Sequence, residues 1–208
     1  MYPSVPQPNP QLNAPPGVNH VNLHSLALLS VATLLSSGAV ASPQDSCSRM
    51  LSSGLQEIVQ RQYPAYRLPL ESDNLPDDIR VNREQGGSGC LGVAVGRYRG
   101  GKASDYALLL YSRASDDKAL LVVASQNGSQ WRIELLRDWG ALRGVLYVES
   151  ARPGKYGRTE KPEAPPGEPG ELSRFTSKVP GILSGRVESS GVAYFFTGKH
   201  WVHVWVSD

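Results

Sequence analysis

The sequence predicts an α+β protein in which one N-terminal amphipathic helix packs on a mainly antiparallel β-sheet or sandwich built from hairpins. Between Cys47 and Val59 the apolar residues recur at helical spacing. From Leu91 onward they form short runs or alternate with polar residues, which is typical of strands. Gly, Asn, Ser and Asp separate these runs, as the tight turns of hairpins require.

The first 44 residues contain no Lys, Arg, Asp or Glu. Their apolar run, Leu26–Leu35, has about half of the ~20 residues needed to cross a bilayer. Ala39 and Ala41 then form an Ala-x-Ala cleavage site. We therefore predict that residues 1–41 are a disordered leader followed by a signal peptide, although a buried N-terminal helix is an alternative. The mature protein would be periplasmic or secreted, with no transmembrane anchor.

Residues 42–208 are predicted to form a single globular domain, because this length is usual for one domain and sufficient for one core. The 21 basic and 19 acidic residues of the chain all lie beyond residue 44. The resulting net charge of +2 gives no field strong enough to attract a polyanion. We therefore expect no nucleic-acid partner.

The two cysteines of the chain are Cys47 and Cys90. In an oxidising compartment, two cysteines within one small domain are expected to form a disulfide. Such a bridge would stabilise the domain by roughly 3 to 4 kcal/mol through its effect on the unfolded chain. Two buried thiols or a metal site are the alternatives.

The predicted elements follow each other along the chain in a simple order. Asp45 or Ser46 is the N-cap of the helix, and Tyr63 with Pro64 ends its pattern. A Pro- and Gly-rich segment at 152–178 is predicted to be an exposed, mobile loop. The predicted strands are Leu91–Val95, Tyr106–Tyr111, Ala119–Ala124, Trp131–Leu135, Gly144–Glu149, Gly191–Phe196 and His200–Val206.

Side chains of the last predicted strand alternate between its two faces. His200 and His203 therefore lie on opposite faces and cannot act as a pair. Trp201, His203 and Trp205 share one face, which could be a stacking surface for a sugar or a peptide. The alternative is that these aromatic residues cover the core.

The segment Gly96–Leu110 resembles an FG-GAP or VCBS-type repeat, whose usual form is Gly-Asp-Phe-Asn-Gly-Asp-Gly-x-x-Asp before an apolar strand. In that family the Asp and Asn side chains supply oxygen ligands to calcium, as in an EF-hand loop. The resemblance implies a strand-loop-strand geometry. The matching positions are Gly96, Tyr98, Gly100, Asp105 and the strand that follows.

Three ligand positions of this repeat are changed, to Arg97, Arg99 and Gly101. A guanidinium group repels Ca²⁺ and cannot ligate it. The resemblance therefore implies that the metal has been lost, and Asp105 is expected to pair with Arg97 or Arg99 instead. We expect no metal and no cofactor.

More loosely, the mature chain resembles a group of uncharacterised exported bacterial proteins. The shared features are the Tyr63–Arg67 stretch after a helix, a single repeat of this kind, and a C-terminal aromatic hairpin ending in Trp205–Asp208. This resemblance implies no particular activity.

No set of residues in the sequence points to catalysis. The two histidines of the mature chain are close together on one apolar strand, and no Gly-x-Ser-x-Gly motif is present. We therefore predict a non-catalytic binding module, of the inhibitor or immunity type, whose partner is a protein or a ligand of the cell envelope. The alternatives are a structural envelope protein and a hydrolase acting on an envelope polymer.

Overall fold

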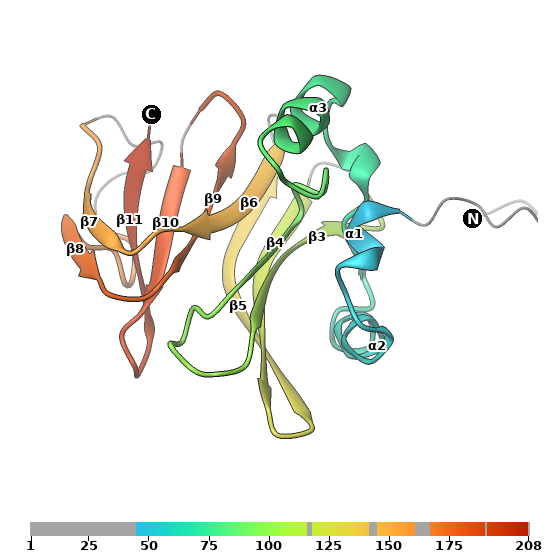
Figure 1. Cartoon of the computed structure of the whole chain (residues 1–208), viewed down its shortest axis with the longest axis horizontal. Coiled ribbons are helices and arrows are strands. Elements are labelled where there is room, and N and C mark those ends of the chain that lie inside the picture. Colours follow the sequence, from blue (N-terminus) through green and yellow to red (C-terminus); the bar gives the residue numbers. More distant parts are fainter. Residues whose placement is uncertain (1–44, 116–117, 142–144, 161–166, 190, 208) are drawn as a thin grey trace, which may run out of the picture. The chain divides into compact units, whose positions relative to one another are not determined.

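The computed structural model describes residues 45–115, 118–141, 145–160, 167–189 and 191–207 (Figure 1). The predicted leader, apolar run and cleavage site lie outside the described residues. Antiparallel sheets make up most of the described chain, and the helices are few and short. The prediction of a sheet-rich, mainly antiparallel fold is therefore confirmed. Within these ranges no helix is long and apolar enough to cross a membrane.

The first sheet has five strands in the order β1-β3-β4-β5, with β2 paired to β3 on the same side as β1. Strand β3 thus has β4 along one side and both short strands along the other. All pairings are antiparallel. The strands are β1 (Tyr66–Arg67), β2 (Val93–Gly96), β3 (Asp105–Ser112), β4 (Lys118–Asn127) and β5 (Gln130–Ala141).

The second sheet has four antiparallel strands in the order β11-β10-β9-β6. In this sheet Gly181 packs closely against Phe195, where an added Cβ would lie 2.4 Å from a ring carbon. A side chain at this position would therefore force the two strands apart. The strands are β6 (Leu146–Ala151), β9 (Gly181–Arg186), β10 (Gly191–Phe196) and β11 (Trp201–Ser207).

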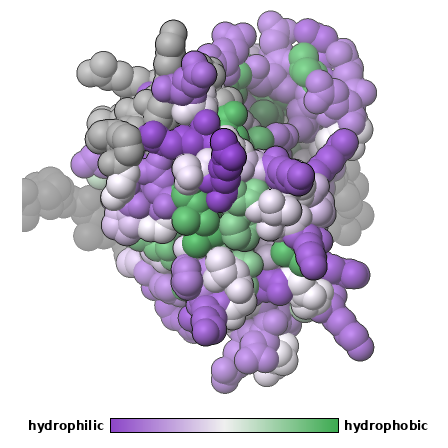
Figure 2. Space-filling model, turned by 90° about the vertical axis from the view of Figure 1, so that its left-hand side faces the viewer, coloured by the Kyte–Doolittle hydropathy of each residue, from purple (hydrophilic) through white to green (hydrophobic). Residues whose placement is uncertain are grey.

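A separate two-stranded sheet pairs β7 (Gly154–Gly157) with β8 (Arg174–Ser177). Both strands lie within 152–178, so the prediction of a loop over this whole segment is wrong at its two ends. The reason is aromatic packing, because Tyr156 and Phe175 lie 4.6 and 5.1 Å from the ring of Phe195. Figure 2 views the molecule from the side of β7 and β8 and shows a small hydrophobic area enclosed by hydrophilic side chains.

The stretch that the periodicity assigned to one helix contains two, α1 (Ser46–Arg49) and α2 (Ser53–Gln62). The Asp45 carboxylate caps α1 by accepting the N–H of Cys47 at 2.9 Å. The Ser52 hydroxyl caps α2 by accepting the N–H of Leu55 at 3.3 Å. Because Ser52 is a good N-cap, a new helix begins where the apolar spacing alone suggested continuation.

Two further helical segments lie between β1 and β2, where no helix or strand was predicted. They are a 3₁₀ turn, η1 (Glu71–Asp73), and α3 (Pro76–Glu84). Pro76 is in the first turn of α3 together with Asp77 and Asp78. Proline is favourable at a helix N-terminus because the N–H groups of the first turn have no partner within the helix. Carboxylates are favourable there because their negative charge is attracted by the positive end of the helix dipole.

The core lies on both sides of the first sheet. One cluster fills the space between the two larger sheets and includes Leu109, Leu121, Ile182 and Trp205. A second cluster lies on the opposite face of the first sheet, where α1 and α2 cover it. The second cluster comprises Cys47, Leu51, Leu55, Val59, Leu68, Cys90, Val93, Leu108, Leu110, Leu120, Val122, Ala124 and Ile133.

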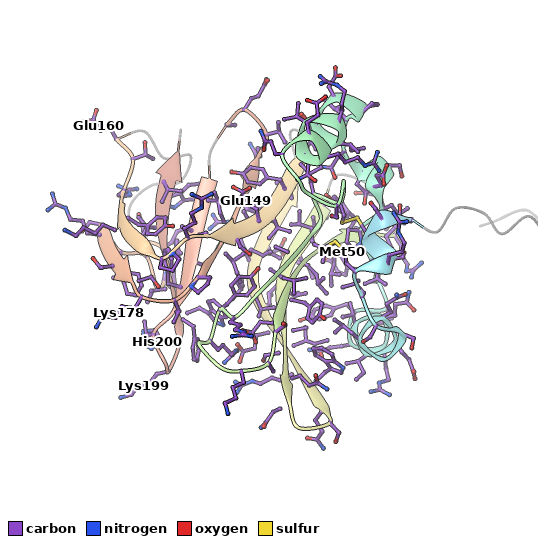
Figure 3. The ribbon with its side chains drawn as sticks, viewed as in Figure 1. Met50, Glu149, Glu160, Lys178, Lys199 and His200 are labelled. Atoms are coloured by element: carbon purple, nitrogen blue, oxygen red, sulfur yellow. A yellow bond between two sulfur atoms is a disulfide. The ribbon has the colours of Figure 1, made fainter. Side chains whose placement is uncertain are left out.

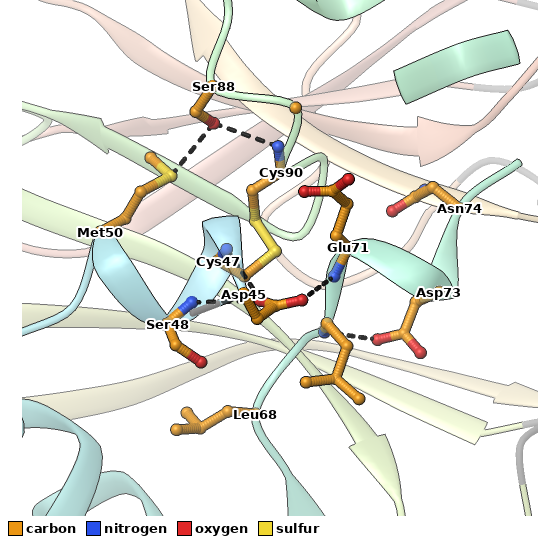
Figure 4. The surroundings of a disulfide bond; sticks show 12 residues. Asp45, Cys47, Ser48, Met50, Leu68, Glu71, Asp73, Asn74, Ser88 and Cys90 are labelled. Atoms are coloured by element: carbon orange, nitrogen blue, oxygen red, sulfur yellow. Dashed lines mark hydrogen bonds between the residues drawn. A yellow bond between two sulfur atoms is a disulfide. The ribbon is translucent and has the colours of Figure 1, made fainter. Parts of the chain in front are cut away.

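A disulfide joins Cys47 and Cys90, whose Cα atoms are 5.0 Å apart, and confirms the predicted bridge (Figure 4). Both residues are buried in the second cluster. The bridge ties α1 to the chain just before β2. The Asp45 carboxylate supports this arrangement, because its second oxygen accepts the N–H of Glu71 at 2.8 Å.

Replacing both Cys47 and Cys90 by Ser should lower the free energy of unfolding by about 3 to 4 kcal/mol, because the unfolded chain gains the freedom of an open loop. Urea unfolding of the oxidised protein and of the double variant measures this difference. Reductant should destabilise the wild type alone. Equal stability of the two proteins would contradict a structural bridge.

Candidate binding groove

The connection between β2 and β3 carries Arg99 across to the hairpin formed by β10 and β11. Its guanidinium carbon lies 4.3 Å from the ring centroid of Phe196 and 5.6 Å from that of Trp201. A guanidinium over aromatic faces is attracted by their negative potential, and more strongly where water is excluded. The side chain of Arg99 is only 19% exposed, so these rings and its ion-pair partner Glu134 cover most of it.

Glu134 of β5 holds three groups around this point. It forms an ion pair with Arg99 and accepts a hydrogen bond from the indole N–H of Trp201 at 3.0 Å. Its other oxygen lies 2.6 Å from the guanidinium of Arg132. Glu134 therefore joins the β2–β3 connection, β5 and β11, and both of its oxygens are occupied.

Two hollows share Arg99 and Arg132 in their walls, and we call them together the Arg99 groove. The larger one, about 640 Å³, lies between β5 and the β10–β11 hairpin and is also lined by Leu135 and Phe196. Lys199 and His200, at the tip of this hairpin in Figure 3, complete its rim. The smaller one, about 300 Å³, is lined by Lys102 and by the β4 residues Ser125, Gln126 and Asn127.

The charge of the groove is positive. Lys102, Arg132 and Lys199 are exposed around it. Of the two carboxylates in its walls, Glu134 is already paired with arginines, and Asp105 is buried. The groove thus places exposed cations beside two aromatic rings. It is suited to a ligand that has an anionic group next to an aromatic or apolar group.

Asp105 does not pair with the guanidinium of Arg99, and this part of the prediction is wrong. Its carboxylate accepts the backbone N–H of Arg99 at 3.0 Å, which closes the turn before β3. The guanidinium of Arg99 is instead held by Glu134 and the aromatic rings. Burial raises the pKa of Asp105 even though Arg99 opposes this shift.

The residues at the three changed calcium-ligand positions lie in different surroundings. Arg97 and Gly101 are exposed, whereas Arg99 points to the second sheet. Across the described ranges, no group of three or more His, Cys, Asp or Glu side chains is placed to hold a metal ion.

Trp201, His203 and Trp205 do not form an open aromatic surface, so this predicted binding face is wrong. Trp205 and His203 are only 1% and 7% exposed, and Trp205 belongs to the core between the sheets. The alternative, in which these residues cover the core, holds for Trp205. Trp201 alone of the three borders the groove. His200 is exposed in the turn before β11, and His203 is buried within that strand.

A second polar cluster was not anticipated from the sequence. Arg137 of β5 donates two hydrogen bonds of 3.0 Å to Glu168, and its guanidinium lies 4.9 Å and 4.8 Å from the rings of Trp139 and Trp205. The Nε2 atom of His203 lies 3.1 Å from Glu168. Glu168 lies in the segment predicted to be a loop, so no local pattern could reveal these partners.

The titration of this cluster follows from its burial. Burial works to raise the pKa of Glu168, but the hydrogen bonds and charge of Arg137 outweigh it and lower that pKa. Burial, assisted by the charge of Arg137, lowers the pKa of His203, although Glu168 acts to raise it. Burial also raises the pKa of Tyr194, nearby, to about 12. The cluster therefore holds an anionic Glu168 against a cationic Arg137 and a neutral His203.

Comparisons of the chain with protein-family models, with curated proteins and with solved structures each found no match. The resemblance of Gly96–Leu110 to an FG-GAP repeat therefore stays a prediction.

Calcium should not stabilise the protein, because Asp105 is bonded to the backbone and two neighbouring ligand positions are arginines. Melting temperatures in Ca²⁺ and in EDTA should be equal. Asp105→Ala should cost about 1 to 3 kcal/mol, since it leaves the buried turn without its acceptor. Exposed Arg97→Ala, the control, should change stability by less than about 0.5 kcal/mol. A calcium-dependent rise in melting temperature that Asp105→Ala abolishes would overturn this expectation.

The free energy of unfolding should decrease as the pH is lowered, because His203 is protonated more easily in the unfolded chain than in the folded protein. The pKa of His203 is held below the value of about 6.5 for a free imidazole, so the unfolded chain takes up the proton first. This contribution to stability is complete above about pH 6.5 and is lost as the pH falls toward the folded-state pKa. Arg137 opposes protonation of His203, while Glu168 and Glu171 favour it.

A second loss should begin below about pH 4.3, where free glutamate protonates but the lowered pKa of Glu168 keeps it charged in the folded state. Urea unfolding over a pH series from about 8 down to about 2 measures both steps. His203→Gln should flatten the first step and leave the second. An unchanged slope between about pH 6.5 and 5 in that variant would contradict the assignment to His203.

Proposed function

We propose that this protein is an exported, non-catalytic binding module of the inhibitor or immunity type, which holds an anionic group of its ligand in the Arg99 groove. One observation carries the proposal. Arg99 is fixed between two aromatic rings and Glu134, and three further cations surround it with exposed side chains. Such a site is arranged before the ligand arrives, so little conformational entropy is lost on binding.

Two features support export. The Cys47–Cys90 bridge is typical of proteins that fold in an oxidising compartment. The Ala-x-Ala site ending at Ala41 follows an apolar run too short to span a bilayer. A periplasmic or secreted location accounts for both, and the ligand would then be a protein or another component of the cell envelope.

The contacts of Glu134 and Glu168 fit a binding site better than the active site of a hydrolase. A hydrolase needs a carboxylate or an imidazole free to move a proton. Glu134 accepts from three groups, and Glu168 is engaged by Arg137 and His203. Both carboxylates therefore act as fixed anchors for arginine.

The groove is tested by removing its three exposed cations together. The mature protein, immobilised, should retain an anionic component from an envelope extract and release it in salt, which screens exposed charges. Retention should fall at least about tenfold in the triple variant, equivalent to ~1.4 kcal/mol. The triple variant is Lys102→Ala, Arg132→Ala and Lys199→Ala.

A second triple variant with the same change of charge on β7, β8 and the residue after β8 is the control, and it should retain the component as the wild type does. Equal loss in both variants would show that net charge acts rather than the groove. Full retention by the first variant would refute the proposed function. The control substitutions are Lys155→Ala, Arg174→Ala and Lys178→Ala, all at exposed residues.

A further inference from the structure

Strand β5 is an open edge of the first sheet. It pairs with β4 on one side, and in the described part of the chain no strand pairs with its other side. It is 12 residues long, whereas strands average about 5 to 6. Natural proteins usually shorten, cover or charge such an edge, because its free N–H and C=O groups attract another strand.

The outward-facing backbone groups of β5 can be assigned. The carbonyl of Ile133 accepts a hydrogen bond from the side-chain amide of Gln62 at 3.5 Å, so it points away from β4. Backbone groups alternate in direction along an antiparallel strand, and the register is regular from Asn127 of β4 to Val122. Trp131, Ile133 and Leu135 therefore present their N–H and C=O outward. Gln62 itself is exposed and can be displaced.

The two faces beside this edge differ in character. On the helix side, Trp131 packs at the margin of the second core cluster. Strand alternation places the side chain of Leu135 on this same side, at the end of the groove that Leu135 also borders, and Leu135 is 51% exposed. On the opposite side, Arg132 and Glu134 face the Arg99 groove with its exposed Lys199. A strand laid along β5 would thus have apolar neighbours for one set of alternate side chains and cationic neighbours for the other.

We propose that an extended segment of a partner protein adds to β5 as a further strand, with apolar side chains beside Trp131 and Leu135 alternating with Asp or Glu beside Arg132 and the groove. This inference rests on the proposed function and names the class of partner. Backbone hydrogen bonds would provide affinity, and the alternating side chains would provide specificity. A second copy of this chain is a poorer occupant, because it would bring two sets of the same cations together.

The probe is a short, end-blocked, fluorescent peptide of alternating Val and Glu, with binding read by anisotropy. Two matched peptides are the controls: one with Lys in place of Glu, and one with the same residues in block order. The alternating Glu peptide should bind at least about tenfold more tightly than either control. Equal binding of all three would overturn the proposal, as would no binding at all.

Variants separate the backbone edge from the charge. Leu135→Pro removes an outward N–H without touching the bonds to β4, and proline is tolerated at a solvent-facing edge. It should abolish binding of the alternating Glu peptide. Arg132→Glu keeps the edge and should transfer the preference to the Lys peptide, so the proposal stays testable if Leu135→Pro does not fold. Arg174→Glu, on β8, should change neither result.

Two further outcomes would overturn the inference in distinct ways. In the first, sedimentation finds a dimer that Leu135→Pro dissociates, which would assign the edge to a second copy. Alternatively, no peptide binds while capture from envelope extract still depends on Lys102, Arg132 and Lys199. In that case the groove binds its anion without strand addition, and the proposed function stands alone.

Discussion

The central strand β3 has apolar side chains on both faces, and both faces have to be covered. Leu108 and Leu110 point to one side and belong to the cluster beneath the helices. Ala107, Leu109 and Tyr111 point to the other side and belong to the cluster between the two larger sheets. Burial of each large apolar side chain contributes about 1.5 to 3 kcal/mol, so neither face can be left in water. The helical layer and the second sheet are both consequences of this one strand.

Two arginine–glutamate pairs fix how the sheets meet along β5 and β11. In the first, Glu134 of β5 binds Arg99 and the indole of Trp201. In the second, Arg137 of β5 lies over Trp205 and binds Glu168. Partly buried ion pairs gain little net stability after desolvation, but an incorrect alignment would leave their charges unpaired. The two pairs therefore mainly select one alignment of the two sheets and add little to the net stability.

Patterns carried by neighbouring residues predicted much of this fold. The apolar run of β3 and the alternation in β11 follow from local sequence, and the pairing of Cys47 with Cys90 follows from the presence of two cysteines in one small domain that is expected to be exported. Elements that depend on distant partners were missed. Strands β7 and β8 exist because Tyr156 and Phe175 meet Phe195, and nothing near them in sequence shows this. For α3, the local signal was Pro76 followed by Asp77 and Asp78, which is typical of the first turn of a helix.

The candidate groove was predictable only in pieces. Arg99 drew attention as a replaced calcium ligand, and Trp201 as part of an aromatic row, but no pattern joined them. Glu134, which does join them, resembled an ordinary solvent-facing residue of a hairpin. The disulfide has a consequence of another kind. The loop that it closes contains α2 and the chain through Leu68, and this part of the chain covers Leu108, Leu110 and Val122 with Leu51, Leu55, Val59 and Leu68. If the bridge is reduced and this cover loosens, an apolar sheet face with high β-propensity becomes accessible, and aggregation follows before unfolding is complete.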